Sequence, residues 1–426
     1  MGFASSSVHI RRCRSLPSTL LAVLLASTGC EDDGAPRVPA EVIVFPSFVV
    51  VDEIGATEQF TAQVQDGNGD LIAGAAVTWS SSDISVAAVE SATGLATARG
   101  PGIATITATS APASGTAGLE VSLFCEQDYV TGQSYYGRNQ YIEYIAGDLP
   151  LVLSAPHGGY LTPEEIPDRT WGTMAQDRQT QELARAIADS VYVRTGGYAH
   201  IIICRVHRSK LDANREIVEA AQGNPHAQQA WYEYHNFIED AKGTVAEEYE
   251  RGFYIDLHGH GHEMQWLELG YLLQSSDLEL SDAQLERPDY VNKSSIRTLA
   301  LEADSGFAAL VRGPTSLGGL LEQRGYPSVP SPAYVHPGGQ PFFSGGYNTA
   351  RHGSRDGGPI SGVQIEANWT GVRDSPGNRE AFAGALAEAL EVYFDLHFRI
   401  DLPGLAPLAS VTASGSRGQG FEPDRR

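Results

Sequence analysis

Histidines gather in two short glycine-containing segments of this sequence. His157 lies in Pro156-His157-Gly158-Gly159, and the stretch 258–262 carries His258, His260 and His262 separated by single glycines. A neutral imidazole is the commonest metal ligand among side chains, and a catalytic zinc ion takes three protein ligands and leaves one position open. The two segments predict a metal site, whereas a lone histidine would more often be an ordinary core or surface residue.

Two common hydrolase signatures are absent from the sequence. His262-Glu263-Met264-Gln265 is followed by Trp266, where the helical zinc-protease motif requires a second histidine. The sequence contains no Gly-x-Ser-x-Gly elbow, which excludes the usual signature of a serine hydrolase. Cys204 lies inside an apolar segment of strand length, which is a poor position for a nucleophile.

Four apolar segments of strand length are each followed directly by His, Arg or Glu. These are residues 151–155 before His157, 201–206 before His207-Arg208, 253–257 before His258, and 362–365 before Glu366. They alternate with amphipathic helical stretches at 176–191, 227–250 and 380–398, which is typical of α/β architecture. In open α/β sheets, ligands bind beyond the carboxyl ends of the strands. We therefore expect an α/β catalytic domain over residues 128–398 with its site at this edge of the sheet.

The preceding segment, residues 39–122, reads as an all-β sandwich of short strands rich in Val and Thr. Expected strands cover 42–44, 60–64, 76–79, 87–89 and 104–108, with turn residues at 66–70. The motifs at 63–66, 77–82, 86–89, 94–95 and 102–107 resemble the bacterial Ig-like domain of group 2. Such modules serve as spacers or adhesive units, and no cluster of catalytic side chains occurs in this one.

The first 29 residues have the features of an export signal. Three arginines between positions 11 and 14 precede an apolar stretch at 16–26, which is shorter than the roughly 20 residues of a membrane span. The segment 26–30 resembles a bacterial lipoprotein box that would make Cys30 the lipidated first residue, although Ser27 stands where Leu is usual. An ordinary signal peptide is the alternative. Both predict an extracytoplasmic protein: a cell-surface or periplasmic lipoprotein, or a secreted one. Residues 30–38 would then be a linker, and the polar stretch 401–426 a disordered tail.

Charge and cysteine content exclude other classes of protein. The chain carries 29 Lys and Arg against 52 Asp and Glu, a formal net charge of −23. This balance excludes nucleic acid as the main partner, because phosphate binding needs clustered positive charge. Four cysteines are too few for a disulfide scaffold. Outside the cytoplasm Cys125 and Cys204 could pair, or remain as buried free thiols.

Residues 128–398 resemble the N-formylglutamate amidohydrolases, within the wider zinc-carboxypeptidase-like group. The resemblance is carried by the motifs at 156–159, 176–180, 208–215, 256–258 and 364–366. It implies a zinc-exopeptidase-like fold and one zinc ion held by His157, His258 and a carboxylate. Asp177 matches the acidic position best, with Glu164 and Glu165 as rivals, because Tyr160 stands where the wider group often has Glu. A helix N-cap is the alternative role for Asp177.

The resemblance also implies roles in substrate binding. Asn214 and Arg215 match the pair that binds a substrate carboxylate in related enzymes, and Asp212 would orient the arginine. The planar guanidinium group of an arginine can form two parallel hydrogen bonds to a carboxylate. A structural ion pair of Asp212 with a nearby arginine is the alternative. Arg351 and His352, in a glycine-rich stretch, are further substrate-binding candidates, with a solvated loop as the alternative.

Two residues carry the implied chemistry. Glu366 stands where the wider group keeps its general base, acting on a water molecule that zinc activates, and it then passes the proton to the leaving amine. Arg208 would stabilise the oxyanion or simply pair with surface acids, and Glu366 could be an ordinary carboxylate at a strand end.

The function expected from these residues is an extracytoplasmic zinc-dependent amidohydrolase. Its substrate would be an N-acyl amino acid or a peptide-like amide that bears a carboxylate. The alternatives are a zinc carboxypeptidase, a cell-wall or poly-glutamate amidase, and a non-catalytic surface-binding protein. Expected partners are that small or peptide-like substrate and, through the Ig-like module, the cell surface or cell wall. Membrane contact would occur only through a lipid anchor.

Overall fold

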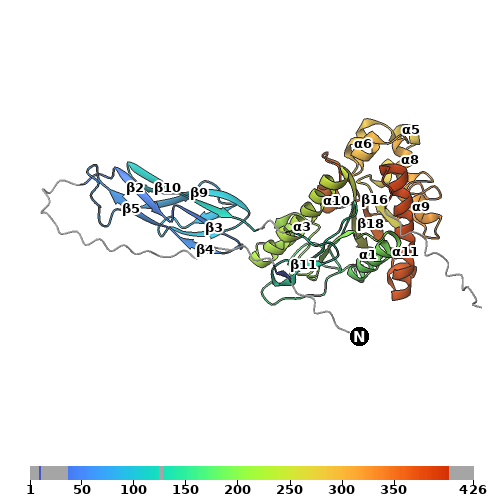
Figure 1. Cartoon of the computed structure of the whole chain (residues 1–426), viewed down its shortest axis with the longest axis horizontal. Coiled ribbons are helices and arrows are strands. Elements are labelled where there is room, and N and C mark those ends of the chain that lie inside the picture. Colours follow the sequence, from blue (N-terminus) through green and yellow to red (C-terminus); the bar gives the residue numbers. More distant parts are fainter. Residues whose placement is uncertain (1–8, 11–36, 124–127, 403–426) are drawn as a thin grey trace, which may run out of the picture.

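The computed structural model describes residues 9–10, 37–123 and 128–402, which form an elongated all-β part and a larger α/β part joined end to end (Figure 1). Cys30, Cys125 and the tail from residue 403 onward lie outside the described residues. The predicted signal segment also lies outside them, except for residues 9–10, which form a short strand. None of the helices in the described ranges has both the length and the apolar character needed to cross a membrane.

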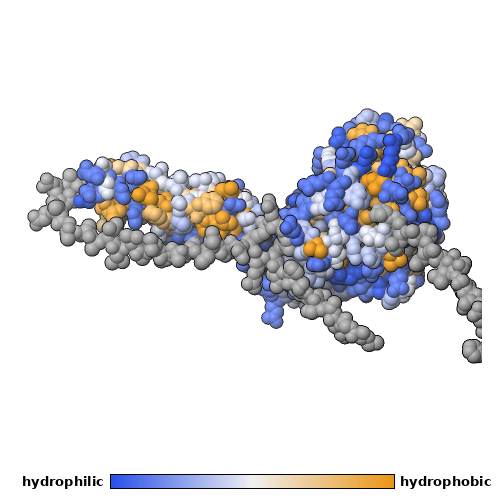
Figure 2. Space-filling model, viewed as in Figure 1, coloured by the Kyte–Doolittle hydropathy of each residue, from blue (hydrophilic) through white to orange (hydrophobic). Residues whose placement is uncertain are grey.

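The all-β part is built from three small sheets. Their strand orders are β3-β10-β9-β6, β2-β5 and β4-β8-β7. The strands are β2 (Glu41–Phe45), β3 (Phe48–Val51), β4 (Thr57–Gln59), β5 (Thr61–Gln65), β6 (Thr78–Ser81), β7 (Ala87–Val89), β8 (Leu95–Ala98), β9 (Gly102–Ser110) and β10 (Ala113–Val121). Alternate residues of these strands point inward around Phe60, Trp79 and Ile106, as expected for a sandwich. Apolar side chains also appear on its surface (Figure 2), among them Phe48, Val50 and Ile103.

The two parts contact each other at the start of α3 (Pro225–Tyr249) and at a 3-10 turn (Arg138–Gln140) of the α/β part. The backbone N–H of Ile54 donates to the side chain of Gln229 at 3.2 Å. Arg138 pairs with Glu53 at 3.0 Å and with Asp52 at 3.5 Å. These polar contacts join the all-β part to the larger part.

A nine-stranded sheet, counted over the described residues, organises the α/β part. Its order is β1-β11-β12-β14-β13-β15-β18-β16-β17. The strands are β1 (His9–Ile10), β11 (Ser134–Tyr136), β12 (Ile142–Ile145), β13 (Leu151–Ala155), β14 (His200–Cys204), β15 (Gly252–Gly259), β16 (Leu267–Gly270), β17 (Ser328–Val329) and β18 (Ile360–Ala367). The four central strands, β14, β13, β15 and β18, are parallel neighbours. These are the four strands predicted from the apolar segments, and their carboxyl ends meet at one edge.

Helices cover both faces of this sheet. Leu151 and Leu153 of β13 pack on the side of α1 (Thr180–Thr195) and α11 (Pro376–Tyr393), whereas Val152 packs on the side of α3 (Pro225–Tyr249). This alternation follows from the two-residue period of a strand. The expected stretch 176–191 begins four residues too early, because α1 starts at Thr180 and leaves Asp177 in the preceding loop.

Short elements fill the remaining connections. The helices are α2 (Ile217–Ala221), α4 (Ser275–Leu278), α5 (Asp282–Leu285), α6 (Pro288–Lys293), α7 (Arg297–Glu302), α8 (Phe307–Arg312), α9 (Leu317–Glu322) and α10 (Tyr347–His352). A 3-10 turn covers Arg138–Gln140, and π turns cover Trp369–Arg373 and Phe394–Phe398. Cys204 at the end of β14 is a buried free thiol, and burial raises its pKa to about 12, so that it is not a nucleophile.

Candidate active site

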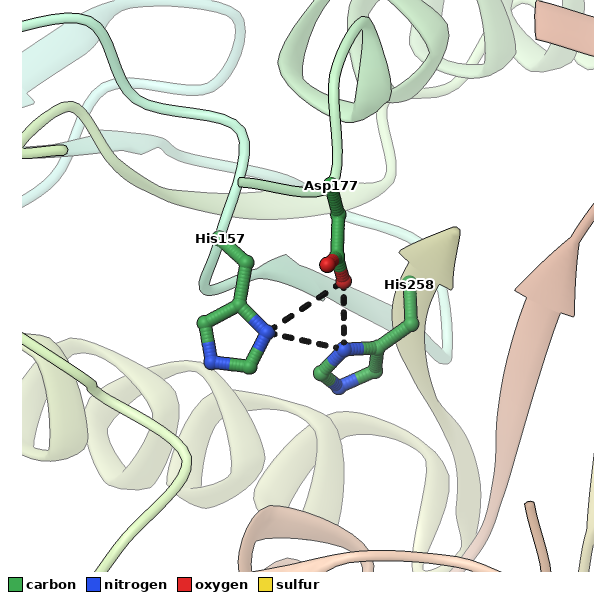
Figure 3. Close-up of side chains that lie close together, drawn as sticks. All are labelled: His157, Asp177 and His258. Atoms are coloured by element: carbon green, nitrogen blue, oxygen red, sulfur yellow. Dashed lines mark hydrogen bonds and ion pairs between the residues drawn. The ribbon is translucent and has the colours of Figure 1, made fainter. Parts of the chain in front are cut away.

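Three side chains converge where the central strands end (Figure 3). His157 follows β13, Asp177 lies in the loop before α1, and His258 is near the end of β15. The two Nδ1 atoms are 3.1 Å apart, and Asp177 Oδ2 lies 3.3 Å from the first and 3.0 Å from the second. All three side chains are buried. The structure thus brings together the three residues that the sequence motifs proposed as metal ligands.

Each of the two histidines contacts an aspartate of its own through Nε2, the ring nitrogen that does not face Asp177. His157 Nε2 lies 2.6 Å from Asp212 Oδ1, and His258 Nε2 lies 2.9 Å from Asp256 Oδ2. A carboxylate at this distance accepts the Nε2 proton and leaves the lone pair on Nδ1. His258 Nε2 is also 3.2 Å from the amide nitrogen of Asn214, but the shorter contact is to a full charge. Both rings therefore present Nδ1 lone pairs to the same point.

This donor set fits a divalent metal ion. Zinc ligands bound at about 2.0–2.1 Å in a tetrahedral arrangement lie about 3.3 Å from one another, close to the separations found here. Burial lowers the pKa of His258, but Asp256 and Asp177 outweigh burial and raise that pKa well above its ordinary value. Burial likewise raises the pKa of Asp177, but the two histidines hold it well below its ordinary value. The group therefore attracts a positive charge, which a proton or a metal ion can supply.

Arg208 and Asn214 flank these three residues. Arg208 Nε donates to Asp212 Oδ2 at 2.9 Å, and its Nη1 lies 3.5 Å from Asp177 Oδ1. Asn214 is buried, and its Oδ1 accepts the backbone N–H of Asn348 at 2.7 Å. Asp212 therefore positions His157 and Arg208; its direct bonds do not include Arg215, the arginine it was expected to orient. Arg215 is half-buried and lies 3.3 Å from Glu219.

Glu366 lies in the strand next to His258. In the sheet register Glu366 of β18 pairs with His258 of β15, and on its other side with Glu268 of β16. Paired residues project to the same face, so the three side chains form a row across adjacent strands. Glu366 is buried, and burial raises its pKa to about 8. A carboxyl group with a pKa near neutrality is suited to accept and release a proton.

These residues line a cleft of about 660 Å³. Four arginines contribute to its wall, namely Arg178, Arg208, Arg215 and Arg373, although the chain as a whole is acidic. Arg373 is buried and donates to the carbonyls of Ala367, Arg178 and His260, which fixes the loops around the site. A cleft lined with guanidinium groups favours an anionic ligand.

The structure places several expected residues elsewhere. Arg351 and His352, which were expected to bind substrate, do not line the cleft that contains the three candidate ligands. Arg351 covers Trp231 and donates to Tyr347, and His352 is fully buried between His235 and Glu239. The reason is that 347–352 folds as α10, which packs beside β18 instead of forming a loop over the site.

The alternatives for the acidic ligand also differ in position. Glu165 bonds to Tyr141 and does not line the cleft, and Glu164 is exposed. Gln179, not Asp177, is the N-cap of α1, so that the carboxylate of Asp177 remains free to face the histidines.

Sequence reasoning missed the residues that support the ligands. Asp256 was noted only as part of a motif, although a carboxylate two residues before His258 in an apolar strand lies on the same face as that histidine. Glu268 and Phe343 were not singled out, since their contacts with His262 and with each other arise only in the folded chain and leave no local signal.

Comparisons with known proteins identify the first module. Residues 40–121 match the family model of the bacterial Ig-like domain (group 2), which confirms that prediction. Domains of this family indicate an extracellular or surface protein. No curated protein matches the chain. A solved structure of domains 4 and 5 of the S-layer protein SbsC matches with 22% identity and a TM-score of 0.19, over 20% of this chain and 54% of that chain. This chain thus spans about half of that structure.

Solved structures that match the larger part include the following two. The N-formylglutamate amidohydrolase from Ralstonia eutropha JMP134 has 11% identity and a TM-score of 0.36, over 61% of this chain and 99% of that chain. The succinylglutamate desuccinylase from Chromobacterium violaceum has 12% identity and a TM-score of 0.26, over 63% of this chain and 68% of that chain. The first carries the family name that the motifs of residues 128–398 resemble. At these scores the argument for function rests on the side chains of the cleft.

Proposed function

We propose that residues 128–398 form a zinc-dependent amidohydrolase that cleaves an amide bond in an N-acyl amino acid or a peptide-like substrate bearing a carboxylate. The observation that supports this most strongly is the pair of histidines, each held by its own aspartate, whose Nδ1 atoms face Asp177 beside Glu366. When bound there, zinc supplies a Lewis acid that polarises a carbonyl and eases the deprotonation of water near neutral pH.

Three residues of the cleft have separate roles in this reaction. Glu366 accepts a proton from the attacking water molecule, because it is a buried carboxyl group beside the ligand cluster. Arg208, held in place by Asp212, stabilises the negative charge that develops on the carbonyl oxygen. Arg215 binds the substrate carboxylate at the wall of the cleft.

The test begins with metal analysis of the purified mature protein. We expect about one zinc ion per chain, lost in His258→Ala and retained in His226→Ala, a matched histidine of α3 that does not line this cleft. Wild-type protein without bound metal after zinc is supplied would refute the proposal and favour a non-catalytic binding protein.

Activity is then measured with N-formyl, N-acetyl and N-succinyl amino acids, peptides with a free carboxylate, and the same compounds with the carboxylate amidated. Glu366→Gln should keep its zinc and lose about 10²–10⁴ in turnover. Full activity of this variant would refute the role of Glu366. Release of only C-terminal residues from peptides would identify a carboxypeptidase instead, and activity only on cell-wall or poly-glutamate fragments would identify an amidase of those polymers.

We further propose that the protein is exported and anchored through Cys30, with the Ig-like domain as a spacer or a contact to the cell surface. The charge pattern of the first 29 residues and the Ig-like family match support this placement. Fractionation of cells that express wild type and Cys30→Ala tests it. Only the wild type should remain with the membrane, and equal release of both would refute lipid anchoring.

A further inference from the structure

A histidine at the wall of the cleft and a buried glutamate beside it form a second polar group, apart from the three candidate ligands. His262 Nδ1 lies 2.7 Å from Glu268 Oε1, and Glu268 is fully buried. The other oxygen of Glu268 accepts the backbone N–H of Phe343 at 2.7 Å. The His262 ring stacks on Phe343, with centroids 4.7 Å apart and an angle of 19° between the planes. The ring is thus fixed by a bond at one edge and by stacking on one face.

This fixation leaves one atom of the ring for a ligand. The Nδ1 proton of His262 is donated to Glu268, so the second nitrogen, Nε2, is the group that can exchange a proton or bind a substrate. No hydrogen bond to Nε2 occurs among the described residues. The side chain is 21% exposed, and it lines the same cleft as His157 and Glu366. A histidine oriented by a buried carboxylate with its other nitrogen in a cleft has the arrangement of an acid–base group.

The same group is a poor metal site, although His260 lies beside it. His260 Nε2 is 2.9 Å from the carbonyl of Trp266 and donates to it, while its Nδ1 accepts the backbone N–H of His262 at 3.1 Å. Both nitrogens of His260 are therefore committed to the backbone. Only His262 and Glu268 remain, and two side chains are fewer than the three protein ligands that a catalytic zinc ion takes.

The strand order places Glu366 between the candidate metal ligands and the His262–Glu268 pair. His258, Glu366 and Glu268 occupy paired positions on three adjacent strands, which are about 4.8 Å apart. Glu366 therefore stands between the ligand cluster and the His262–Glu268 pair. A substrate whose carbonyl carbon lies by the metal ligands and Glu366 can direct its leaving nitrogen toward His262.

We propose that His262 is the proton donor to the leaving nitrogen, a role that the sequence assigned to Glu366; this inference rests on the proposed amidohydrolase function. Glu366 takes one proton from the attacking water molecule, and the remaining hydroxide adds to the carbonyl carbon. The amide nitrogen then takes the Nε2 proton of His262 as the C–N bond breaks, with the electron pair of that bond going to nitrogen. The products are a carboxylic acid and an amine. Glu366 loses its proton to solvent, and His262 regains one from solvent.

The experiment compares two leaving groups on one acyl group in the zinc-loaded, full-length protein. One substrate is the N-acyl amino acid that the wild type hydrolyses. The other is the 3-carboxy-4-nitrophenyl ester of the same acyl group, whose phenolate leaves without a proton and which keeps a carboxylate on the leaving side. We expect His262→Gln to lower kcat for the amide by about 10²–10³, and to change the ester by less than about threefold. Glu268→Gln should also lower kcat for the amide more than for the ester, but by a smaller factor than His262→Gln. His226→Gln should leave kcat unchanged for both substrates.

Each other outcome refutes a specific statement. Equal losses on amide and ester in His262→Gln, with wild-type zinc content, would show that His262 only shapes the cleft and would overturn its role as donor. Two zinc ions per wild-type chain, with one lost in His262→Gln, would replace the donor by a second metal site. A zinc-loaded wild type that hydrolyses neither substrate class would refute the proposed function, and the inference would fall with it. If His262→Gln does not fold, the loss of kcat for the amide relative to the ester in Glu268→Gln decides between these outcomes.

Discussion

Replacing Asp256 by Asn tests how the metal ligands are held. Asp256 Oδ1 accepts a hydrogen bond from Ser154 Oγ at 2.8 Å. It also accepts hydrogen bonds from the Tyr254 hydroxyl and the Asn348 amide, at 3.3 Å each. Three donors at this position favour the amide oxygen of the new Asn there, which turns its NH₂ group toward His258 Nε2. Asn214 already offers a donor to that nitrogen. His258 would then carry its proton on Nδ1, where a ligand lone pair is needed.

The expected effect is large for a residue that never touches the ion. Loss of a carboxylate behind a metal-binding histidine weakens metal binding about 10–100-fold. Because both neighbours of Nε2 become donors, we expect the upper end, about 100-fold, or about 2.7 kcal/mol. Competition with a chromogenic zinc chelator measures the affinity, and circular dichroism checks the fold.

Asp277→Asn is the matched control, because Asp277 is a buried carboxylate, bonded to Lys293, that does not line the cleft. This variant should bind zinc as the wild type does. Wild-type zinc affinity in Asp256→Asn would refute the argument that Asp256 sets the tautomer of His258.

Three further predictions address stability and substrate binding. Burial lowers the pKa of His200 to about 4, so the stability that its neutral form supports is complete above pH 6.5 and is lost as pH falls toward 4. The free energy of unfolding measured in urea should fall by about 2 kcal/mol between pH 7 and pH 5 because of this residue. His200→Gln should remove this contribution to the pH dependence. A Cβ on Gly159 would lie 2.3 Å from the backbone of Arg205, whereas one on Gly261 meets nothing within 4 Å, so Gly159→Ala should lower the melting temperature and zinc content while Gly261→Ala leaves both unchanged. Arg215→Ala should raise KM about 10–100-fold for substrates with a carboxylate, and an unchanged KM would refute its role.

The sequence was sufficient to predict the central sheet and most of the candidate metal ligands that the structure brings together. Apolar runs that end in His157, Arg208, His258 and Glu366 identify parallel strands, and parallel strands bring their carboxyl ends together. Asp177 was found through its motif, and its distinction from Glu164 and Glu165 required the observed path of the loop before α1.

Other parts of the site depend on pairings that no local pattern records. Glu268 reaches Glu366 only because β16 adds to β18 in the antiparallel direction, and one residue of slip would turn its side chain to the other face. Arg351 and His352 looked like loop residues because glycines surround them. Instead, helix formation at 347–352 buries His352 and leaves Asn348 as the residue that bonds to Asn214.

The spacing of the three ligands along the chain has a consequence for folding. His157 and His258 are separated by 101 positions, with Asp177 in another loop. An ion held by all three joins loops that approach each other only in the folded sheet, so it binds the native state and not the extended chain. At a free concentration 1,000 times its Kd, such an ion adds about 4 kcal/mol to the free energy of unfolding. A protein that acquires its metal after export would therefore gain much of its resistance to unfolding and proteolysis only outside the cell, and a chelator in the medium would expose it to both.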